Sequence, residues 1–257
     1  MLKSRYSPVE SLKIMGHAPN QVMGPNIELL LWNVFKCKKK GWLEDFKTLT
    51  CDKDLLLLQE AILNSPFDID FKKSLQHQWM MARSFKNVKT NIVTGVKTGS
   101  TVAAQQHYFS VSKHSEPVSQ TKKMLLATLY PLPTLGQSLL VVNSHLINFV
   151  SFEKFRAHLD QVFHTLENHN GPILLAGDFN TWNGKRLRYF NQLATSFSLE
   201  EVKMDRKPRL NHLFHHLDHI YFRGLEVVNA HVHTNIHSSD HYPISLSLHT
   251  LNPVAIK

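Results

Sequence analysis

The sequence predicts an α/β protein in which two β-sheets pack together and helices cover their outer faces. Apolar runs of strand length outnumber amphipathic helical segments, and several of these runs follow one another along the chain. Some runs are apolar throughout, as in strands that are covered on both faces. The 257 residues, 42% of them hydrophobic, are enough for an ample core. Two packed sheets with outer helices satisfy these observations.

The first half of the chain mixes strand and helix patterns. Residues 1–26 hold Pro, Gly and charged residues and predict an N-terminal arm, mobile or draped over the domain. Helical spacing of Trp42, Phe46 and Leu49 predicts a helix there. The expected elements are strands at 27–35 and 54–60, helices at 41–49 and 70–85, and a hairpin of short strands within 91–112.

The second half follows the same pattern. Ser151 opens a long amphipathic segment and Gly171 closes it, as at the two ends of a helix. No repeat or composition break divides the chain, so one domain is expected over 27–250, followed by a C-terminal tail at 251–257. The expected elements are antiparallel strands at 124–132 and 138–146, a helix at 151–171, a strand at 172–179, a helix at 184–197, and strands at 217–224, 225–234 and 242–248.

Charge and cysteine content narrow the function classes. The formal net charge of +9 favours anionic partners: nucleic acid, phosphorylated metabolites or acidic lipid headgroups. The N-terminal arm has no apolar run of signal-peptide length, and the longest apolar stretches are far shorter than a membrane span. We therefore expect a cytoplasmic protein without stable membrane insertion. Cys37 and Cys51 do not have the spacing of a metal site or a redox motif, so we expect free structural thiols. A single disulfide between them is the alternative.

Polar residues end several of the predicted strands. In "LLAGDFNT", Asp178 and Asn180 follow a buried strand, where both residue types commonly form turns. On an extended backbone the two would face the same side and Phe179 the other. Singly, each such residue has an ordinary explanation as a cap, a turn or a core histidine. The full set is Asn33, Glu60, His145, Asn148, Asp178, Asn180, Asp218, Asp240 and His241.

Taken together, these residue types indicate metal-assisted chemistry on phosphate. Carboxylate and carboxamide oxygens suit a hard ion such as Mg²⁺ or Mn²⁺. Imidazoles beside carboxylates suit proton transfer and phosphate binding, so the set predicts hydrolysis of a phosphoester. The tract "NHLFHHLDH" also suggests a metal, but His212, His215, His216 and His219 lack the ligand spacing of a zinc site.

Six blocks in order make the chain resemble the endonuclease/exonuclease/phosphatase superfamily, the fold of DNase I. The resemblance extends over about residues 27–248 and is nearest to the bacterial YafD-like branch. It implies a four-layer α/β sandwich of two mainly antiparallel central sheets flanked by helices. The blocks are "WN" (32–33), "LLLQE" (56–60), "NSHL" (143–146), "GDFN" (177–180), "LDHIYF" (217–222) and "SDHYP" (239–243).

The resemblance also implies roles in metal and water binding. Glu60 would be the main ligand of Mg²⁺ or Mn²⁺. Asn33 would help to hold the metal or its water, and Asp240 would be a further metal or water contact. Asp178 would orient or deprotonate the attacking water, and Asn180 would hydrogen-bond that water or the scissile phosphate.

The remaining implied roles concern the phosphate. His241 would bind it and stabilise the transition state, and Asp218 would orient His241. His145 would face the phosphate from the other side and could protonate the leaving oxygen, while Asn148 matches a phosphate contact of some branches. Where the AP endonuclease branch has Tyr-x-Pro-Asn, this chain has "HLIN", which is closer to the DNase I, sphingomyelinase and phosphatase branches.

The substrate is less constrained. Lys185, Arg186 and Arg188 follow the "GDFN" block and could track a nucleic-acid backbone, although a solvated helix face explains them equally well. Trp182 could stack on a base or belong to the core. We expect a Mg²⁺- or Mn²⁺-dependent nuclease acting on a phosphodiester, with no obligate protein partner. The alternatives are a hydrolase of inositol phosphates or sphingomyelin, of phosphatase or phospholipase type, and a catalytically inactive binding protein.

Overall fold

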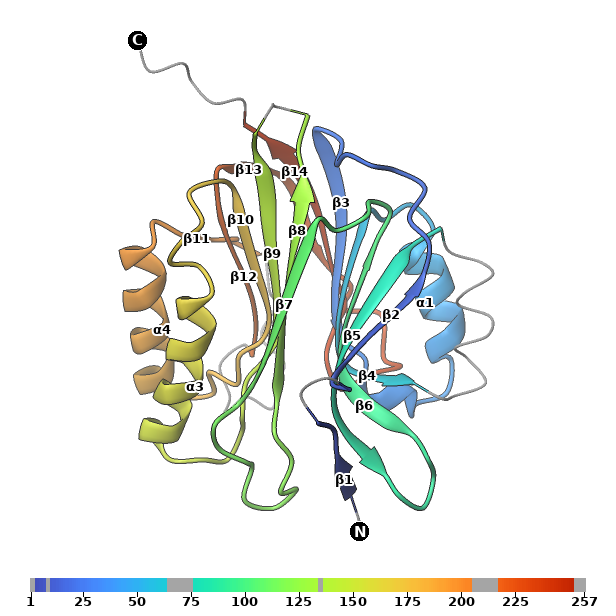
Figure 1. Ribbon diagram of the computed structural model, residues 1–257, viewed down its shortest axis with the longest axis vertical. Coiled ribbons are helices and arrows are strands. Elements are labelled where there is room, and N and C mark those ends of the chain that lie inside the picture. Colours follow the sequence, from blue (N-terminus) through green and yellow to red (C-terminus); the bar gives the residue numbers. More distant parts are fainter. Residues whose placement is uncertain (1–2, 8–9, 64–75, 134–135, 205–216, 252–257) are drawn as a thin grey trace.

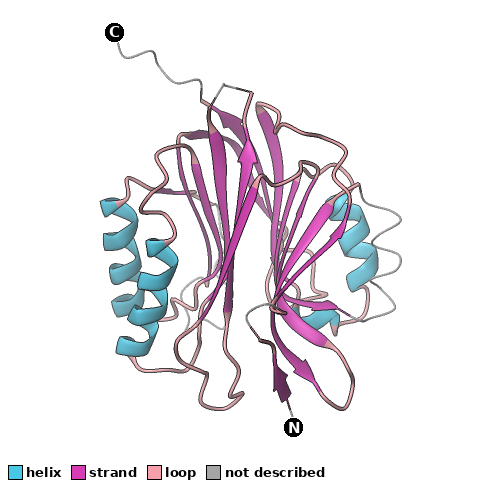
Figure 2. Ribbon diagram, in the orientation of Figure 1, coloured by secondary structure: helices cyan, strands magenta, loops and turns pink. Residues whose placement is uncertain are grey.

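The computed structural model contains two β-sheets packed face to face, with helices on both outer faces (Figures 1 and 2). It describes the chain except for residues 1–2, 8–9, 64–75, 134–135, 205–216 and 252–257. The predicted four-layer α/β sandwich is confirmed. No helix within the described ranges is both long and apolar enough to cross a membrane.

One sheet contains eight strands and is built around a parallel pair. Strands β3 (Asn26–Asn33) and β4 (Leu55–Leu63) run parallel at its centre, and the other pairings are antiparallel. The remaining members are β1 (Lys3–Arg5), β2 (Leu12–Gly16), β5 (Gln78–Asn87), β6 (Val93–Ser100), β13 (Leu225–Val232) and β14 (Ile244–Thr250). The order is β1-β5-β6-β4-β3-β14-β13, with β2 also paired to β5.

The second sheet contains six strands and repeats this plan. Strands β9 (Ser138–His145) and β10 (Ile173–Asp178) form its parallel pair. Antiparallel strands extend the sheet on both sides, including the predicted β8–β9 pair. The other members are β7 (Gln106–Val111), β8 (Met124–Pro131), β11 (Glu200–Glu201) and β12 (Asp218–Arg223), in the order β11-β12-β10-β9-β8-β7.

The described helices form the two outer layers. Helix α1 (Trp42–Thr50) covers the eight-stranded sheet, after the short 3₁₀ element η1 (Phe35–Cys37). Helices α3 (Phe152–His164) and α4 (Gly184–Ser196) cover the six-stranded sheet (Figure 1). The side chains of Ser151 and Asn183 cap α3 and α4 by accepting backbone N–H groups of the first turn.

Alternation along the central strands explains why they are apolar on both faces. Leu29 and Leu31 of β3 pack between the sheets, whereas Leu30 and Trp32 pack beneath α1. Strand β10 repeats the pattern: Leu174 and Ala176 face the other sheet, and Ile173 and Leu175 face α3 and α4. Each central strand therefore contributes to two of the three apolar layers.

Two predicted elements are wrong. The expected helix at 70–85 is strand β5 over residues 78–87, and residues 70–75 lie outside the described ranges. Trp79 and Met81 pack on one side of β5, and Met80 and Ala82 on the other, which is the two-residue period of a strand. The expected hairpin within 91–112 is absent because β6 and β7 belong to different sheets.

The N-terminal arm belongs to the sheet where it is described. Strands β1 and β2 both pair with β5, so these parts are draped along the eight-stranded sheet. Cys37 and Cys51, both in the described part of the chain, do not form a disulfide.

We predict that His158 makes the fold less stable in acid. Its Nδ1 accepts the Ile147 N–H at 3.2 Å, and burial lowers its pKa to about 3. Because the unfolded chain binds this proton near pH 6.5 and the folded chain only near pH 3, stability falls as pH drops through this window, by about 1.4 kcal/mol per unit. Urea unfolding between pH 6.5 and 4.5 should show a shallower pH dependence for His158→Asn. Parallel slopes for the two proteins would contradict this.

Candidate active site

The candidate site is the polar end of the apolar layer between the sheets. Asp178 continues the face of β10 that carries Leu174 and Ala176, and Asn33 continues the face of β3 that carries Leu29 and Leu31. By the same alternation, His145 and Asp218 end the inner faces of β9 and β12. The site residues therefore converge because the inner faces of four strands end together.

Strand register places Asp178 between two other site residues. It is directly paired with His145 across the parallel β9–β10 pair and with Asp218 across the antiparallel β10–β12 pair. The strands approach closely at Gly177, where an added Cβ would lie 1.9 Å from the carbonyl oxygen of Ser144. Glycine is required at this position because it has no Cβ.

The chain turns immediately after Asp178. Asn180 has a left-handed backbone (φ 51°), and its N–H donates to Asp178 Oδ1 at 3.1 Å. The extended geometry expected for residues 178–180 is therefore wrong, although Phe179 does pack inward. Asn180 Nδ2 donates to the carbonyl of Leu146 at 2.9 Å, which fixes the following loop to β9. The Asp178 carboxylate thus stabilises the turn through the Asn180 N–H and is also part of the candidate site.

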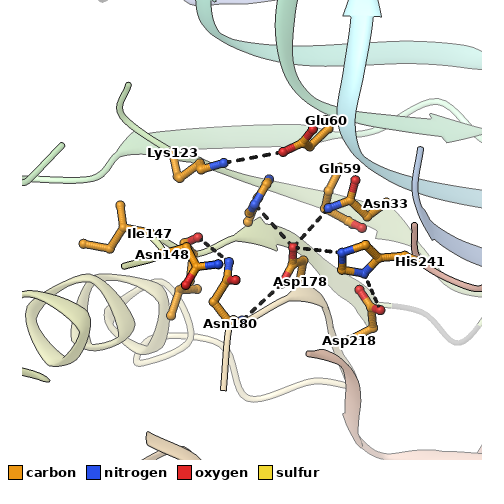
Figure 3. Close-up of polar contacts among 12 residues, drawn as sticks. Asn33, Gln59, Glu60, Lys123, Ile147, Asn148, Asp178, Asn180, Asp218 and His241 are labelled. Atoms are coloured by element: carbon orange, nitrogen blue, oxygen red, sulfur yellow. Dashed lines mark hydrogen bonds and ion pairs between the residues drawn. The ribbon is translucent and has the colours of Figure 1, made fainter. Parts of the chain in front are cut away.

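The Asp178 carboxylate joins side chains from both sheets (Figure 3). Asn33 Nδ2 donates to Asp178 Oδ2 at 3.0 Å. The Nε2 atoms of His145 and His241 lie 3.4 and 3.8 Å from the same oxygen. Asp178 is only 3% exposed, so its carboxyl group lies in the interior beside one amide and two imidazoles.

His241 is held from its opposite side. Its Nδ1 lies 2.7 Å from Asp218 Oδ2, which is the pairing expected from the resemblance. The backbone carbonyl of His241 accepts the Trp32 indole N–H at 3.1 Å. With Nδ1 engaged, the Nε2 of His241 is directed towards Asp178.

Burial and neighbouring charges separate the pKa values of these groups. Burial raises the pKa of Asp178, with the His241 charge opposing it and the Asp218 charge adding to it. Burial alone would lower the pKa of His241, but Asp218 outweighs it, so that pKa is raised. Burial lowers the pKa of His145 well below its usual range, and the nearby Lys123 adds to the effect. At neutral pH the site therefore contains a cationic His241 and a neutral His145.

Glu60 reaches the site from a β-bulge. The pairing of β4 with β6 shifts register between Leu58 and Ala61, and Glu60 has a left-handed backbone (φ 50°). It forms an ion pair with Lys36, and Lys123 Nζ lies 3.8 Å from its Oε1. Burial acts to raise the pKa of Glu60, but the two ammonium groups outweigh it and lower that pKa. Glu60 is therefore an ionised carboxylate held beside two ammonium groups.

The donor chemistry fits a hard divalent cation at Glu60. Among the described residues, the group whose ligand atoms lie within 4.8 Å of one another is Asp178, Asp218 and His241. Because Asp218 is already hydrogen-bonded to His241, this group is better suited to proton transfer than to binding a cation. Glu60 is ionised and has ammonium counter-charges on flexible stems, which a divalent ion can displace. Glu60 and Asp240 do not belong to that compact group.

The predicted nucleic-acid contacts divide into exposed and buried residues. Lys185 and Arg188 are exposed on α4, and Lys185 Nζ lies 4.1 Å from the Phe152 ring centroid. Arg186 is 1% exposed, which removes it from the predicted contacts. Its guanidinium donates to the carbonyls of Asn180 at 2.9 Å and Val150 at 2.8 Å. Arg186 thus ties the "GDFN" turn to the loop after β9.

Trp182 and Asn148 lie together beside this turn. The Trp182 indole N–H donates to Asn148 Oδ1 at 2.9 Å, and the Arg186 guanidinium lies over the Trp182 ring. The Asn148 backbone N–H donates to Glu116 Oε1 at 2.9 Å. Asn148 is placed near Asn180 (Figure 3), whereas Trp182 is packed by Arg186 on one face.

Several residues of the site were not predicted. Lys36 and Lys123 surround Glu60, and Lys123 also lies 3.4 Å from Glu116. Behind the site, Gln59 Nε2 donates to Asn143 Oδ1 at 2.6 Å and links the two sheets. Lys36, Gln59 and Asn143 stand in or beside the recognised blocks, which was the available signal.

The histidine tract gives no support for a second metal site. His212, His215 and His216 lie outside the described residues. His219 is buried, with its two ring nitrogens 2.6 Å from Thr181 Oγ1 and Glu201 Oε1. His219 is therefore part of the packing between β12 and its neighbours.

The sandwich and the site together define a DNase I-like protein. The chain belongs to the endonuclease/exonuclease/phosphatase family, which matches residues 30–241. Membership of this family supports a phosphoester hydrolase, and the family generally uses divalent metals. The predicted family is thereby confirmed.

Individual relatives agree with this assignment. A UPF0294 protein of Yersinia pseudotuberculosis is 34% identical over 224 residues, which span 86% of this chain and 84% of the relative. These YafD-like relatives confirm the predicted branch. An endonuclease/exonuclease/phosphatase from Beutenbergia cavernae has a TM-score of 0.71 at 15% identity, covering 89% of this chain and 72% of that one. The human Nocturnin catalytic domain has a TM-score of 0.66 at 17% identity, covering 95% and 100%.

We predict that Lys36 competes with a divalent cation for Glu60. Replacing it in Lys36→Met should tighten Mn²⁺ binding about fivefold, the equivalent of a partly exposed ion pair of about 1 kcal/mol. The matched control is Lys38→Met, because Lys38 is exposed and lies over the Phe35 ring. Isothermal titration calorimetry measures both affinities. Equal or weaker Mn²⁺ binding by Lys36→Met would show that Lys36 does not compete with the cation for Glu60.

Proposed function

We propose that the chain is a Mg²⁺- or Mn²⁺-dependent nuclease that hydrolyses a phosphodiester by in-line attack of water. Family membership supports the broader class of phosphoester hydrolase. The observation that carries the proposal is the buried Asp178 carboxylate, shared by two imidazoles in opposite charge states. Paired titratable groups with separated pKa values are typical of acid–base catalysis.

In this proposal Asp178 activates the water. Burial raises its pKa, which makes it a stronger base than an exposed carboxylate. The amide of Asn33 orients the carboxylate through one oxygen, and the Asn180 N–H orients it through the other. A base fixed at both oxygens loses little entropy when it receives the proton.

The two histidines act on the phosphate in different ways. His241, kept cationic by Asp218, stabilises negative charge that develops on the phosphoryl oxygens. His145 is kept neutral by burial, so we assign it to hydrogen bonding of the phosphate and not to proton donation. The carboxamides of Asn148 and Asn180 complete the predicted phosphate contacts.

Glu60 and Asn33 are the proposed metal ligands, with Asp240 as a further contact. A bound Mg²⁺ or Mn²⁺ would supply Lewis-acid neutralisation of phosphate charge. Asp240 lies beside Ser239, whose hydroxyl donates to the carbonyl of Asn33 at 2.6 Å, so the loop of Asp240 is fixed to β3. Binding the cation at Glu60 would release Lys36 and Lys123 towards an anionic substrate.

Basic side chains near the site favour a polyanionic substrate. Residues Lys38, Lys39 and Lys40 are exposed directly after η1, and Lys39 Nζ donates to the carbonyl of Ser239 at 2.6 Å. Lys185 is exposed in the first turn of α4, in the helical layer that covers the other sheet. Basic groups beside the site would contact phosphates that flank the scissile one, which supports nucleic acid over a small phosphoester.

The test is cleavage of supercoiled plasmid and single-stranded DNA in Mg²⁺, Mn²⁺ or EDTA. We expect metal-dependent nicking by the wild type and a loss of about 10²-fold or more in His241→Ala, as for removal of one stabilising group. The matched control is His249→Ala, because His249 is a partly exposed histidine on β14 that contacts Asn26 at 2.8 Å. It should cleave like the wild type.

Two outcomes would count against the proposal. Equal nicking by His241→Ala and His249→Ala would place the cleavage in a contaminant or another site. If folded wild-type protein leaves DNA intact, the same variants should be assayed on RNA, inositol phosphates and sphingomyelin. Turnover of one of the latter two, with loss in His241→Ala, would replace the nuclease assignment.

A further inference from the structure

A pocket of about 130 Å³ opens beside the candidate catalytic groups. Resting on the proposed function, we infer that this pocket receives one ring, the sugar or the base, of the nucleoside joined to the scissile phosphate. Substrate specificity would then be decided here, one bond away from the reacting phosphorus.

The pocket shares part of its wall with the site. Glu60 and His145 line it, as do the two ammonium groups of Lys36 and Lys123. A phosphate held by His145 and these cations would lie at one end of the pocket. The group esterified to that phosphate would then point along the pocket, away from Asp178.

The volume matches a single ring. For comparison, an engineered cavity of about 150 Å³ in another protein binds one benzene molecule. A space of about 130 Å³ therefore admits one sugar or base but not a stacked pair. A duplex could enter only with one nucleotide displaced from its stack.

The lining suits a ring that carries polar substituents. Phe85, Val96 and Met124 supply apolar surface, and the polar residues Ser84 and Thr121 line the pocket beside them. The two sides of the pocket come from different sheets. Strands β5 and β6 form one side, and the loop of residues 112–123 with the start of β8 forms the other.

The loop wall is fixed by its own hydrogen bonds. Ser112 N–H donates to the carbonyl of Lys123 at 2.9 Å, and Glu116 N–H donates to the carbonyl of Thr121 at 2.9 Å. The Ser119 hydroxyl donates to Glu116 Oε2 at 2.7 Å. Because Glu116 also accepts the Asn148 N–H, the wall is joined to the catalytic loop. A pre-formed wall reduces the ordering cost of binding.

Two variants would block the pocket from opposite sides. Ser119→Phe adds a ring on the loop wall, and Ser84→Leu adds bulk from β5. The matched control is Val118→Phe, because Val118 is on the same loop and 90% exposed. Calorimetry would measure binding of thymidine 5′-monophosphate, thymidine 3′-monophosphate and inorganic phosphate in Mn²⁺.

The wild type and Val118→Phe should bind at least one thymidine nucleotide about tenfold or more tighter than inorganic phosphate, as for one well-packed group. Both blocking variants should bind nucleotides no tighter than phosphate. Cleavage of oligothymidylate by these variants should lose the same factor in kcat/KM. Nucleotide preference that survives both blocking variants would overturn the inference.

The binding arm separates this inference from the nuclease proposal because it needs no turnover. Preference for a nucleotide without cleavage of any nucleic acid would keep the pocket assignment and remove the activity. Cleavage by a wild type that binds nucleotides no tighter than phosphate would remove the pocket assignment and keep the activity. An equal loss of phosphate binding in the blocking variants would also overturn it, since the pocket would then belong to phosphate binding itself.

Discussion

The buried Asp178 carboxylate is the group on which the rest of the site depends. Ionisation is unfavourable in a dry interior unless partners compensate for lost hydration. Here Asn33 comes from one sheet, His145 from a neighbouring strand, and His241 from the loop before β14. These partners meet only if both sheets end at the same level and β10 keeps its register with β9 and β12. The need to solvate one carboxylate thus fixes the relative position of the two sheets.

Strained backbone surrounds this carboxylate. Glu60 and Asn180, neither of them glycine, have left-handed φ values, and Phe35, Lys36 and Cys37 share that conformation. Such conformations cost about 1–3 kcal/mol each and persist where the surroundings hold them. Arg186 holds the Asn180 turn through two carbonyls, and β-sheet pairing on both sides of the bulge holds Glu60. The strained backbone lowers the stability of the fold, and it orients the side chains of Glu60 and Asn180 towards the site.

The sequence predicted the element types of the central strands and outer helices, because apolar runs and helical periods there are long. It failed at 78–87, where the consecutive apolar residues Trp79 to Ala82 lie between polar residues and show no two-residue alternation. The ordered blocks located the residues that end the inner faces. Arg186, Lys36 and Lys123 could not be placed, because burial of an arginine and pairing of Glu60 with two lysines are set by distant segments. Local pattern carries no information on such contacts.

The most direct test of this account compares turnover and thermal midpoint in Asp178→Asn on a phosphodiester that the wild type hydrolyses. Because burial raises the pKa of Asp178, folding disfavours its charge, and the isosteric amide removes that penalty. We expect a loss of about 10²-fold or more in rate, as for removal of a general base, with an unchanged or higher midpoint. Retained turnover would show that Asp178 is not the base of the reaction, and a midpoint several degrees lower would show that its carboxylate stabilises the fold.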